Sequence, residues 1–391
     1  MPWEVTCVMD QRVEFIGDWL QGECSMAELC RRYDVSRKTG YKFVARYEQA
    51  GLDGLKDRLR APHHHPHEVR PEIQAAIRQA RVAHPTWGPG KLLAWLQRHD
   101  PPTNWPGAST IGDLLHREGL TVPRRRTHRT PPYSQPFAEC GAPNAVWCAD
   151  FKGWFRTADG KPCYPFTLSD AYSRFLLRCQ ALRQSDYQAV GPLFEAAFRE
   201  YGLPQSIRTD NGPPFASNGL GGLSRLAVWW IKLGIMPERI AAGRPEQNGR
   251  HERRHRTLKE EATIPPQATR RAQQQAFDLF RHTYNHERPH QALEQAVPAS
   301  YYSRSERAYP RGVPRVQYPD EVEVRRVRHS GEIRWQGELL YVSELLAGEL
   351  VGLAPIDDRF RRLYFGPLEL ARIDCHTNRL IIPKPARRPS R

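Results

Sequence analysis

Apolar positions recur at helical spacing in three consecutive stretches near the start of the chain, residues 10–21, 25–33 and 36–50. Ser25 opens the second stretch as part of a Ser-x-x-Glu capping box, and Ser36 caps the third. In the first stretch the pattern predicts an inward side formed by Val13, Ile16 and Leu20. We therefore expect three short helices, with the last two joined by a tight turn.

Two helices joined by such a turn are typical of a helix-turn-helix, which we assign to residues 1–60. In this geometry the first turns of the third helix face DNA. The residues predicted to bind DNA there are Arg37, Lys38, Thr39 and Lys42. An ordinary three-helix bundle with a cationic surface is the alternative.

A second helical unit, also helix-turn-helix-like, is predicted over residues 71–122, with helices at 72–84, 90–98 and 109–118. We expect Ser109 to cap the last of these helices. The pattern leaves open whether this unit binds DNA or only braces the first. Residues 123–143 form a proline-rich basic linker, in which Arg124, Arg125 and Arg126 are predicted to contact DNA.

From residue 144 the pattern changes to apolar strands that alternate with amphipathic helices, as far as about residue 305. Three strands come first (144–154, 163–173 and 175–183), followed by helix 189–201, strand 205–209, helix 223–233 and strand 235–240. Helices beginning near residues 250 and 268 complete the region. This order predicts an α/β domain with a mixed sheet.

The C-terminal part has short alternating strands separated by turns, which predict a small β-barrel over residues 313–382. A basic tail, residues 383–391, follows it. The whole chain is thus expected to be multidomain: all-α in front, α/β in the centre and all-β at the end.

Charge and cysteine usage restrict the classes of function. The formal net charge is +15 with a pI near 9.6, which indicates a polyanionic partner, most often nucleic acid. A membrane-surface or ribosome-associated protein has the same balance. No apolar run is long enough to span a membrane, and the eight cysteines form no Cys-x-x-Cys pair, so we expect a cytosolic chain with reduced thiols.

Three carboxylates carry the candidate chemistry. Asp150 lies inside an apolar strand, where an unpaired charge is costly, and therefore needs a cation or hydrogen-bond donors. Asp210 ends another strand, although taken alone it has the features of a turn aspartate. Glu252 lies on a helix with a strongly basic face. Together they could hold two Mg²⁺ ions for in-line phosphoryl displacement on DNA or RNA.

The basic face of the helix beginning near residue 250 has two interpretations. Glu252, His255, Arg256 and Lys259 stand at i, i+3, i+4 and i+7 and so share one side of the helix. They can form a solvated face held together by Glu–Arg pairs, or a surface for a phosphate backbone around a metal-binding acid.

Several short motifs resemble those of bacterial insertion-sequence transposases with a retroviral-type integrase core. They are Trp147-Cys148-Ala149-Asp150, Thr209-Asp210-Asn211-Gly212, Pro245-x-x-Asn248-Gly249-x-x-Glu252 and Tyr284-Asn285-x-x-Arg288-Pro289-His290, with Asp170-x-x-Ser173-Arg174 also similar. The order and spacing of these motifs carry the resemblance, which is strong over residues 144–302 and weaker at both ends.

The resemblance implies a ribonuclease-H-like fold and a DDE triad of Asp150, Asp210 and Glu252 that binds two Mg²⁺ or Mn²⁺ ions. It implies a transposase that cleaves the ends of its element and joins the 3′ ends to target DNA, acting as a homo-oligomer on double-stranded DNA in the bacterial nucleoid. DNA contacts are predicted at Asn248, Arg253, His255, Arg256 and Lys259.

Two points of this assignment need support from structure. Glu246, Glu260 and Glu261 compete with Glu252, which is preferred because the family's acid follows Asn-Gly by three residues. The segment between Asp210 and Glu252 is also longer than is common in the family, and we expect the excess to be a flexible loop at 217–222. A regulator that kept the fold without transposing and a structure-selective nuclease are the alternative functions.

Overall fold

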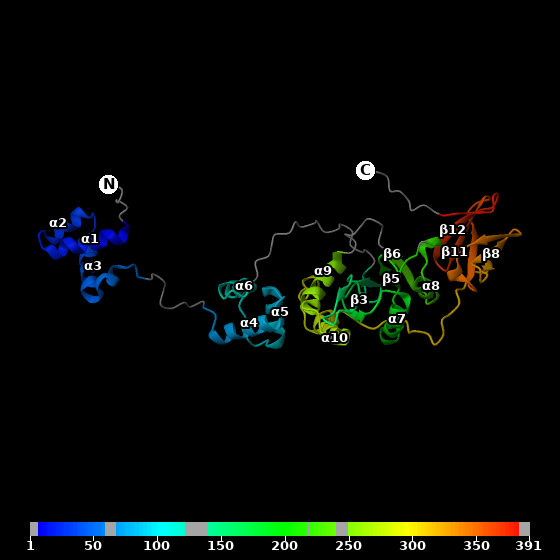
Figure 1. The fold of residues 1–391 in the computed structure, drawn as a ribbon, viewed down its shortest axis with the longest axis horizontal. Helices are drawn as coiled ribbons and strands as arrows, with labels where there is room; N and C mark the ends of the chain where they lie inside the picture. Colours follow the sequence, from blue (N-terminus) through cyan, green and yellow to red (C-terminus); the bar gives the residue numbers. More distant parts are fainter. Residues whose placement is uncertain (1–6, 59–67, 122–139, 218, 240–248, 383–391) are drawn as a thin grey trace. The chain divides into compact units, whose positions relative to one another are not determined.

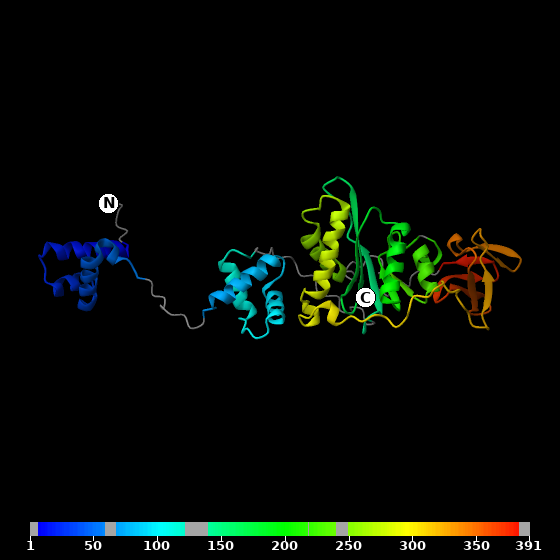
Figure 2. The same cartoon turned by 90° about the horizontal axis from the view of Figure 1, so that it is seen from below.

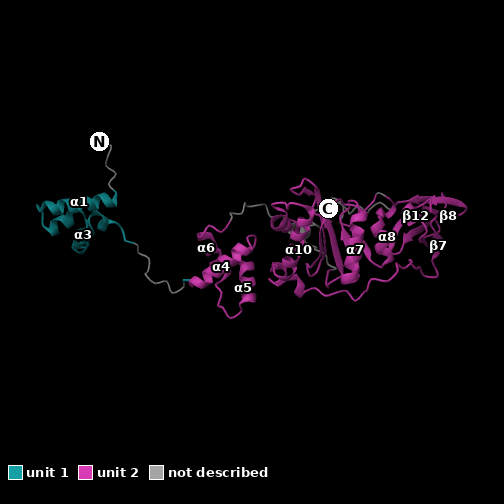
Figure 3. Cartoon of the chain, turned by 60° about the horizontal axis from the view of Figure 1, so that its bottom comes forward, with its two compact units in different colours: residues 1–68 teal, residues 69–391 magenta. Residues whose placement is uncertain are grey.

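A computed structural model describes residues 7–58, 68–121, 140–217, 219–239 and 249–382, with the side chains of 249–253 outside the described part. The chain divides into two compact units, residues 1–68 and 69–391 (Figure 3). Each unit is described by itself. Within the described residues, no helix is both long enough and apolar enough to cross a membrane.

The first unit contains the three predicted helices, α1 (Val8–Gln21), α2 (Met26–Arg32) and α3 (Arg37–Ala50), followed by the 3₁₀ turn η1 (Gly51–Leu55). Ser25 and Glu28 form the predicted capping box, and the Ser36 hydroxyl accepts a hydrogen bond from the Thr39 amide at 3.2 Å. A short turn joins α2 to α3, as a helix-turn-helix requires.

The predicted inward side of α1 is only partly correct. Ile16 is buried as expected, but Val13 and Leu20 are 40% and 58% exposed, and Phe15 takes the inward position beside Ile16. The core of this unit is completed from the other helices, by Leu29, Cys30, Val44 and Leu55. Helix α1 packs against both α3 and η1. Its buried face is therefore rotated by about one residue from the face that the spacing of Val13, Ile16 and Leu20 predicts.

Two glycines of the first unit give a matched stability prediction. A Cβ at Gly40 would lie 2.6 Å from Cys30 Sγ, whereas a Cβ at Gly17 meets nothing within 4 Å. We expect Gly40→Ala to destabilise the protein by about 1–3 kcal/mol through overpacking. Gly17→Ala should stabilise it by about 0.5–1 kcal/mol through helix propensity. Urea unfolding of both variants tests this, and a stable Gly40→Ala variant would contradict the close approach of α2 and α3.

The second unit begins with three helices, α4 (Pro71–Ala83), α5 (Pro89–His99) and α6 (Ala108–Arg117), packed around the buried Trp87. The predicted cap at Ser109 is wrong, since α6 begins one residue earlier and Gly107 is its N-cap without a side-chain hydrogen bond. Local propensity could not distinguish these neighbouring start points.

The central sheet has the order β2-β3-β1-β5-β6, with β4 paired to β3. Its strands are β1 (Val146–Phe151), β2 (Phe155–Arg156), β3 (Pro162–Asp170), β4 (Leu176–Leu182), β5 (Ser206–Thr209) and β6 (Met236–Arg239). β1 is antiparallel to β3 and parallel to β5, so the sheet is mixed as predicted (Figure 1).

Helices cover both faces of this sheet. On one face α7 (Tyr187–Tyr201) and α8 (Arg225–Lys232) bury the main core around Trp147, Phe194 and Trp230. On the other face α9 (Gly249–Leu258), the π-helical turn η4 (Lys259–Thr263) and α10 (Arg270–His286) bury a second cluster with Cys179, Leu258 and Phe277. Figure 2 shows the two groups of helices, one green and one yellow-green, on opposite sides of the strands.

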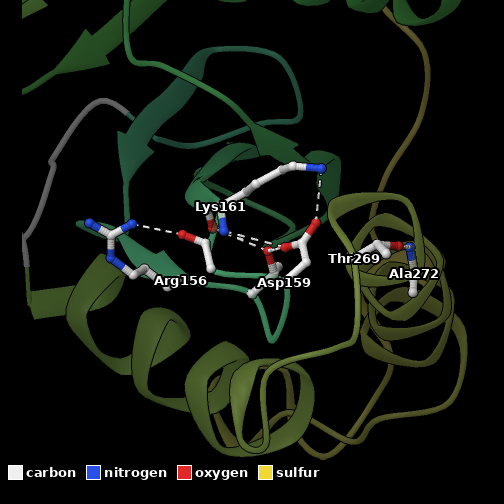
Figure 4. A network of polar contacts seen from close by, with 7 residues as sticks. Arg156, Asp159, Lys161, Thr269 and Ala272 are labelled. Carbon is white, nitrogen blue, oxygen red and sulfur yellow. Dashed lines mark hydrogen bonds and ion pairs between the residues drawn. The ribbon is translucent and has the colours of Figure 1, made fainter.

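A hairpin beyond β1 is fixed to the start of α10. In its turn the Asp159 carboxylate accepts from Thr157 and pairs with Lys161 at 3.2 Å, and Arg156 donates to the carbonyl of Gly160 (Figure 4). The amide of Asp159 also donates to the carbonyl of Ala268 at 3.1 Å. The strand that carries Asp150 thus continues into an anchored turn.

The predicted small β-barrel is not confirmed. Its strands form an open antiparallel sheet of order β13-β12-β11-β10-β7, with a separate β8–β9 hairpin. The bounds are β7 (Glu323–Arg326), β8 (Glu332–Trp335), β9 (Glu338–Tyr341), β10 (Leu350–Pro355), β11 (Phe360–Phe365), β12 (Leu368–Asp374) and β13 (Arg379–Ile381). The short strands separated by turns that the pattern predicted over this region are thus present, but they form an open sheet and a hairpin.

The physical reason for the open sheet is its contact with the central domain. Ala227, Val228 and Ile231 of α8 and the preceding Leu223 share one buried cluster with Leu353, Leu363 and Phe365 of the C-terminal sheet. Lys232 of α8 also pairs with Glu349 at 2.5 Å. The apolar face of the sheet is therefore covered by α8 and does not need to close on itself.

The segment expected to be a flexible loop takes part in the same contact. Among residues 217–222, the described part includes the turn η2 (Leu220–Gly222), and a Cβ at Gly221 would lie 2.9 Å from Leu370 of β12. The Arg239 guanidinium donates to the carbonyls of Gly221 and Gly222 at 2.8 and 2.6 Å. The additional residues between Asp210 and Glu252 thus contribute to the contact between the central domain and the C-terminal sheet.

Candidate metal and DNA site

Asp150 lies near the end of β1 and is 7% exposed. Side chains alternate between the faces of a strand, and Trp147 and Ala149 point into the core under α7 and α8. Asp150 therefore projects from the opposite face, which α9 and α10 cover. In the antiparallel neighbour β3, Thr167 stands directly opposite Asp150.

Asp210 follows the strand that lies parallel to β1. Val146 pairs with Ser206 and Cys148 with Arg208, and the pairing of β1 with β5 ends there, two residues before each aspartate. Asp150 lies within β1, whereas Asp210 directly follows β5, and its Oδ1 accepts a hydrogen bond from the Gly212 amide at 3.1 Å. The turn predicted at Asn211-Gly212 thus orients the Asp210 carboxylate just beyond the end of β5.

Helix α9 lies over the face of the sheet that carries Asp150. Arg254 donates to the Ser169 hydroxyl, and His255 Nε2 lies 3.2 Å from Thr167 Oγ1. His255 Nδ1 lies 3.7 Å from Asp150 Oδ2. Glu252 belongs to the same helix, three residues before His255, and its side chain is outside the described part.

Burial sets the protonation of the groups around Asp150. It lowers the pKa of His255 to about 3, with help from the positive charges of Arg254 and Lys152, so the imidazole is neutral at physiological pH. Burial raises the pKa of the Cys148 thiol to about 12, so this cysteine stays protonated and is not a nucleophile. Neither the imidazole nor the thiol therefore carries a charge at physiological pH.

The described basic residues predicted to bind DNA differ in exposure. Arg256 of α9 and Lys259, the first residue of η4, are exposed, but His255 is buried against Thr167, so the three do not form one exposed face. In α3, Arg37, Lys38 and Lys42 are exposed, while Thr39 is partly buried and its hydroxyl bonds to Ser36 at 2.9 Å. The other predicted DNA contacts lie outside the described residues or side chains: Arg124, Arg125, Arg126, Asn248 and Arg253.

The competing acids differ in their surroundings. The Glu261 carboxylate accepts from the Arg288 guanidinium and the Thr86 hydroxyl, so it already has a structural role. Glu260 is exposed on η4, two turns beyond position 252 of α9. Glu246 lies outside the described residues. Glu261 is thus accounted for without a metal ion.

Sequence reasoning missed Thr167 and Arg254, which contact the site directly. The available signal for Thr167 was a hydroxyl in an otherwise apolar stretch of β3, opposite the aspartate of β1. Asp170, noted in a motif, has a different role: it accepts from the Asn144 amide at 2.8 Å and from Ser173 Oγ at 2.6 Å, and so ties the β3–β4 turn to the start of β1. Burial raises its pKa.

The donor set suits a hard divalent cation. Asp150 and Asp210 offer carboxylate oxygens, which are the ligands that Mg²⁺ and Mn²⁺ take. Among the side chains that the structure describes, no group of three or more His, Cys, Asp or Glu residues is close enough to hold a metal ion. The side chain of Glu252, the acid of α9, lies outside that part.

The chain matches family models along most of its length. Residues 141–245 and 233–298 match the integrase core domain, residues 11–63 a helix-turn-helix domain, and residues 39–115 a homeodomain-like domain. It is 26% identical over 245 residues to an uncharacterized 31.7 kDa protein of insertion element IS407 from Burkholderia multivorans, covering 61% of this chain and 85% of that protein. Together these matches support an insertion-sequence transposase with a retroviral-type integrase core.

A second insertion-element protein and a solved structure are also similar to this chain. An uncharacterized 39.2 kDa protein of insertion element IS476 from Xanthomonas euvesicatoria is 26% identical to it, over 72% of this chain and 79% of its own length. The solved catalytic core domain of HTLV-2 integrase, a complex with magnesium, aligns with a TM-score of 0.33 and 16% identity over 41% of this chain and 98% of its own. The integrase core places the chain in the polynucleotidyl transferase superfamily.

Proposed function

We propose that this chain is an active DDE transposase, which cleaves DNA at the ends of its element and joins the freed 3′ ends to target DNA. The observation that carries the proposal is the parallel register of β1 with β5, which, continued by two residues, would place Asp150 opposite Asp210, on the face of β1 that the helix containing Glu252 covers. Positions 252 and 255 share one side of α9, and His255 is already directed at Asp150. In this proposal Glu252 of α9 is therefore the third acid beside Asp150 and Asp210.

The triad of Asp150, Asp210 and Glu252 would hold two Mg²⁺ or Mn²⁺ ions. Such ions lower the pKa of the attacking water or hydroxyl and stabilise the charge on the attacking and leaving oxygens. The chain's own part is to fix the carboxylates, since Asp210 is oriented by the Gly212 amide and Asp150 lies between β3 and α9. Rigid placement of this kind reduces the entropic barrier to reaction.

The basic residues would hold the nucleic acid. In this proposal α3 recognises the element ends, while the exposed Arg256 of α9 and Lys259 of η4 contact phosphates beside the triad. The C-terminal sheet adds contacts that do not depend on base sequence. Two ends must be brought together before joining, so we propose a homo-oligomer assembled on double-stranded DNA.

A strand-transfer assay tests the proposal. Purified protein is mixed with labelled DNA carrying the element's terminal repeats, a supercoiled target plasmid and Mg²⁺, with Glu252→Gln in parallel. Joined product from the wild type alone is the expected result. Cut ends that never join would indicate the nuclease, and tight end binding with neither product in Mg²⁺ or Mn²⁺ would indicate the regulator.

Recognition through α3 has its own test. Arg37→Ala and Lys42→Ala each remove an exposed cation at the start of this helix. We expect weaker binding to the ends, and each lost phosphate contact should reduce the salt slope by about one unit. Lys56→Ala, which removes an exposed cation outside α3, is the matched control. If all three variants had the same salt slope and the same affinity for the element ends, α3 would not be the helix that recognises them.

A further inference from the structure

Two short motifs have no role in the proposed chemistry, and the structure brings them together. One is Tyr284-Asn285-x-x-Arg288-Pro289-His290 at the end of α10, and the other is Trp87-Gly88-Pro89-Gly90 at the start of α5. In the first motif, the side-chain amide of Asn285 exchanges hydrogen bonds with the main chain of Leu176 in β4, at 2.8 and 3.0 Å. Arg288 therefore follows a helix end that is already attached to the central sheet.

The guanidinium of Arg288 connects segments that are distant in the sequence. It donates to the Glu261 carboxylate of η4, and its Cζ lies 5.9 Å from the centroid of the Trp87 ring, within the range of a cation–π contact. The same carboxylate accepts from the hydroxyl of Thr86, the residue before Trp87. These four side chains form a closed set of contacts, which we call the Arg288 cluster: Thr86, Trp87, Glu261 and Arg288.

The Arg288 cluster is shielded from solvent. Trp87 and Arg288 are buried, and the Glu261 side chain is 16% exposed. Removal of one partner from a buried ion pair is strongly destabilising, because the other charge stays buried. Arginine suits this position because its planar group can pair with a carboxylate and stack on an aromatic ring at the same time. The cluster thus restricts how its segments can be arranged, since a shift of one segment leaves a charge unpaired.

The cluster attaches the three-helix unit α4–α6 to the catalytic core. Trp87 belongs to the apolar core that α4, α5 and α6 share. A further contact comes from Arg98 of α5, which donates to the main-chain carbonyls of Glu287 and Gln295 at 3.3 and 3.4 Å. On the other side, Glu261 belongs to η4, which continues α9 directly. The cluster therefore joins this unit to the end of the helix that covers Asp150.

We propose that α4–α6 braces the catalytic core and that Arg288 is the positioning residue that couples this unit to α9. The sequence pattern left open whether the unit binds DNA or braces the first helical unit, and the contacts favour a role on the core itself. Arg254 and His255 hold the middle of α9 against β3, and the cluster holds the segment that follows it. The catalytic part of this inference rests on the proposed function, whereas the attachment does not.

Hydrogen exchange of the full chain, followed by mass spectrometry, tests the attachment. In Arg288→Ala the amides of residues 71–99 and 258–263 should exchange about a hundredfold faster, because a buried pair is broken. Residues 350–374 of the C-terminal sheet should keep their wild-type rates. Arg271→Ala, which changes an exposed arginine at the start of α10, is the matched control and should exchange like the wild type. Unchanged exchange in residues 71–99 of Arg288→Ala would overturn the attachment.

Thr86→Val is the milder variant, and it decides the matter if Arg288→Ala exchanges faster in every region. It removes one hydrogen bond to Glu261 without removing a charge. The amides of residues 258–263 should exchange about tenfold faster, because the lost hydrogen bond is to a charged group. Wild-type rates in this variant would show that Thr86 does not hold η4 and would overturn the cluster.

Cleavage kinetics separate positioning from attachment. In Thr86→Val, single-turnover cleavage of labelled ends should fall by about tenfold to a hundredfold through misplacement of α9, while the affinity for the ends is unchanged. Arg271→Ala should cleave like the wild type. Faster exchange with normal cleavage would overturn the positioning role. A wild type that cleaves no DNA would contradict the proposed function alone, because the exchange results test the attachment without it.

Discussion

Asp150→Asn and Asp210→Asn are expected to abolish DNA cleavage while leaving the affinity for element ends within about twofold. Each substitution replaces a carboxylate, in β1 or directly after β5, by an amide with almost no change in volume. Metal ions supply several kcal/mol of transition-state stabilisation. Because each 1.4 kcal/mol corresponds to a factor of about ten, the rate should fall by about a thousandfold or more.

The measurements are single-turnover cleavage of labelled ends and a binding titration on the same DNA. Glu252→Gln should behave like the two aspartate variants. Asp278→Asn, which changes an exposed acid on α10, is the matched control and should cleave normally. An equal loss of cleavage and binding in the aspartate variants would show that these residues act on DNA affinity or folding, and would sink their assignment to metal.

Removal of residues 311–391 is expected to unfold the central domain, although every strand of the central sheet remains. The deletion exposes Leu223, Val228 and Ile231, which are buried against the C-terminal sheet. Full exposure of each such side chain costs about 1.5–3 kcal/mol. The sum, about 5 kcal/mol or more, is comparable to the total stability of many domains.

Circular dichroism during thermal unfolding measures this effect. Deletion of residues 1–68 is the matched control, because these residues form a separate compact unit, and it should leave the melting transition of the remainder unchanged. Ile231→Ala in the full chain should cost about 2–5 kcal/mol. A truncated protein that melts at the wild-type temperature would contradict the shared core.

Local chemistry was enough to predict much of the fold. The Ser25–Glu28 capping box and the Ser36 cap set the starts of α2 and α3. They could be predicted because each of these hydrogen bonds joins residues that are close in the sequence. The alternation of apolar residues gave the central strands. Asp150 and Asp210 could be singled out because an acid within or directly after an apolar strand needs a specific partner.

Features that depend on distant segments could not be predicted in this way. Whether His255 or Arg256 is buried depends on how α9 meets β3, which no spacing within the helix specifies. The open C-terminal sheet depends on α8, which ends at Lys232, whereas the first strand of the sheet begins only at Glu323. The same applies to the expected flexible loop at 217–222, in which the described turn η2 contacts β12 through Gly221.

The separation of the first unit from the catalytic residues has a consequence during synthesis of the protein. Residues 1–68 form a compact unit of their own, whereas the metal site needs Asp150, Asp210 and α9 together. Roughly 180 residues lie between the end of that unit and Glu252, and a ribosome takes about 10–40 s to translate them. A growing chain therefore presents its helix-turn-helix tens of seconds before it can form a metal site. During that interval the polypeptide is still tethered to its own messenger RNA.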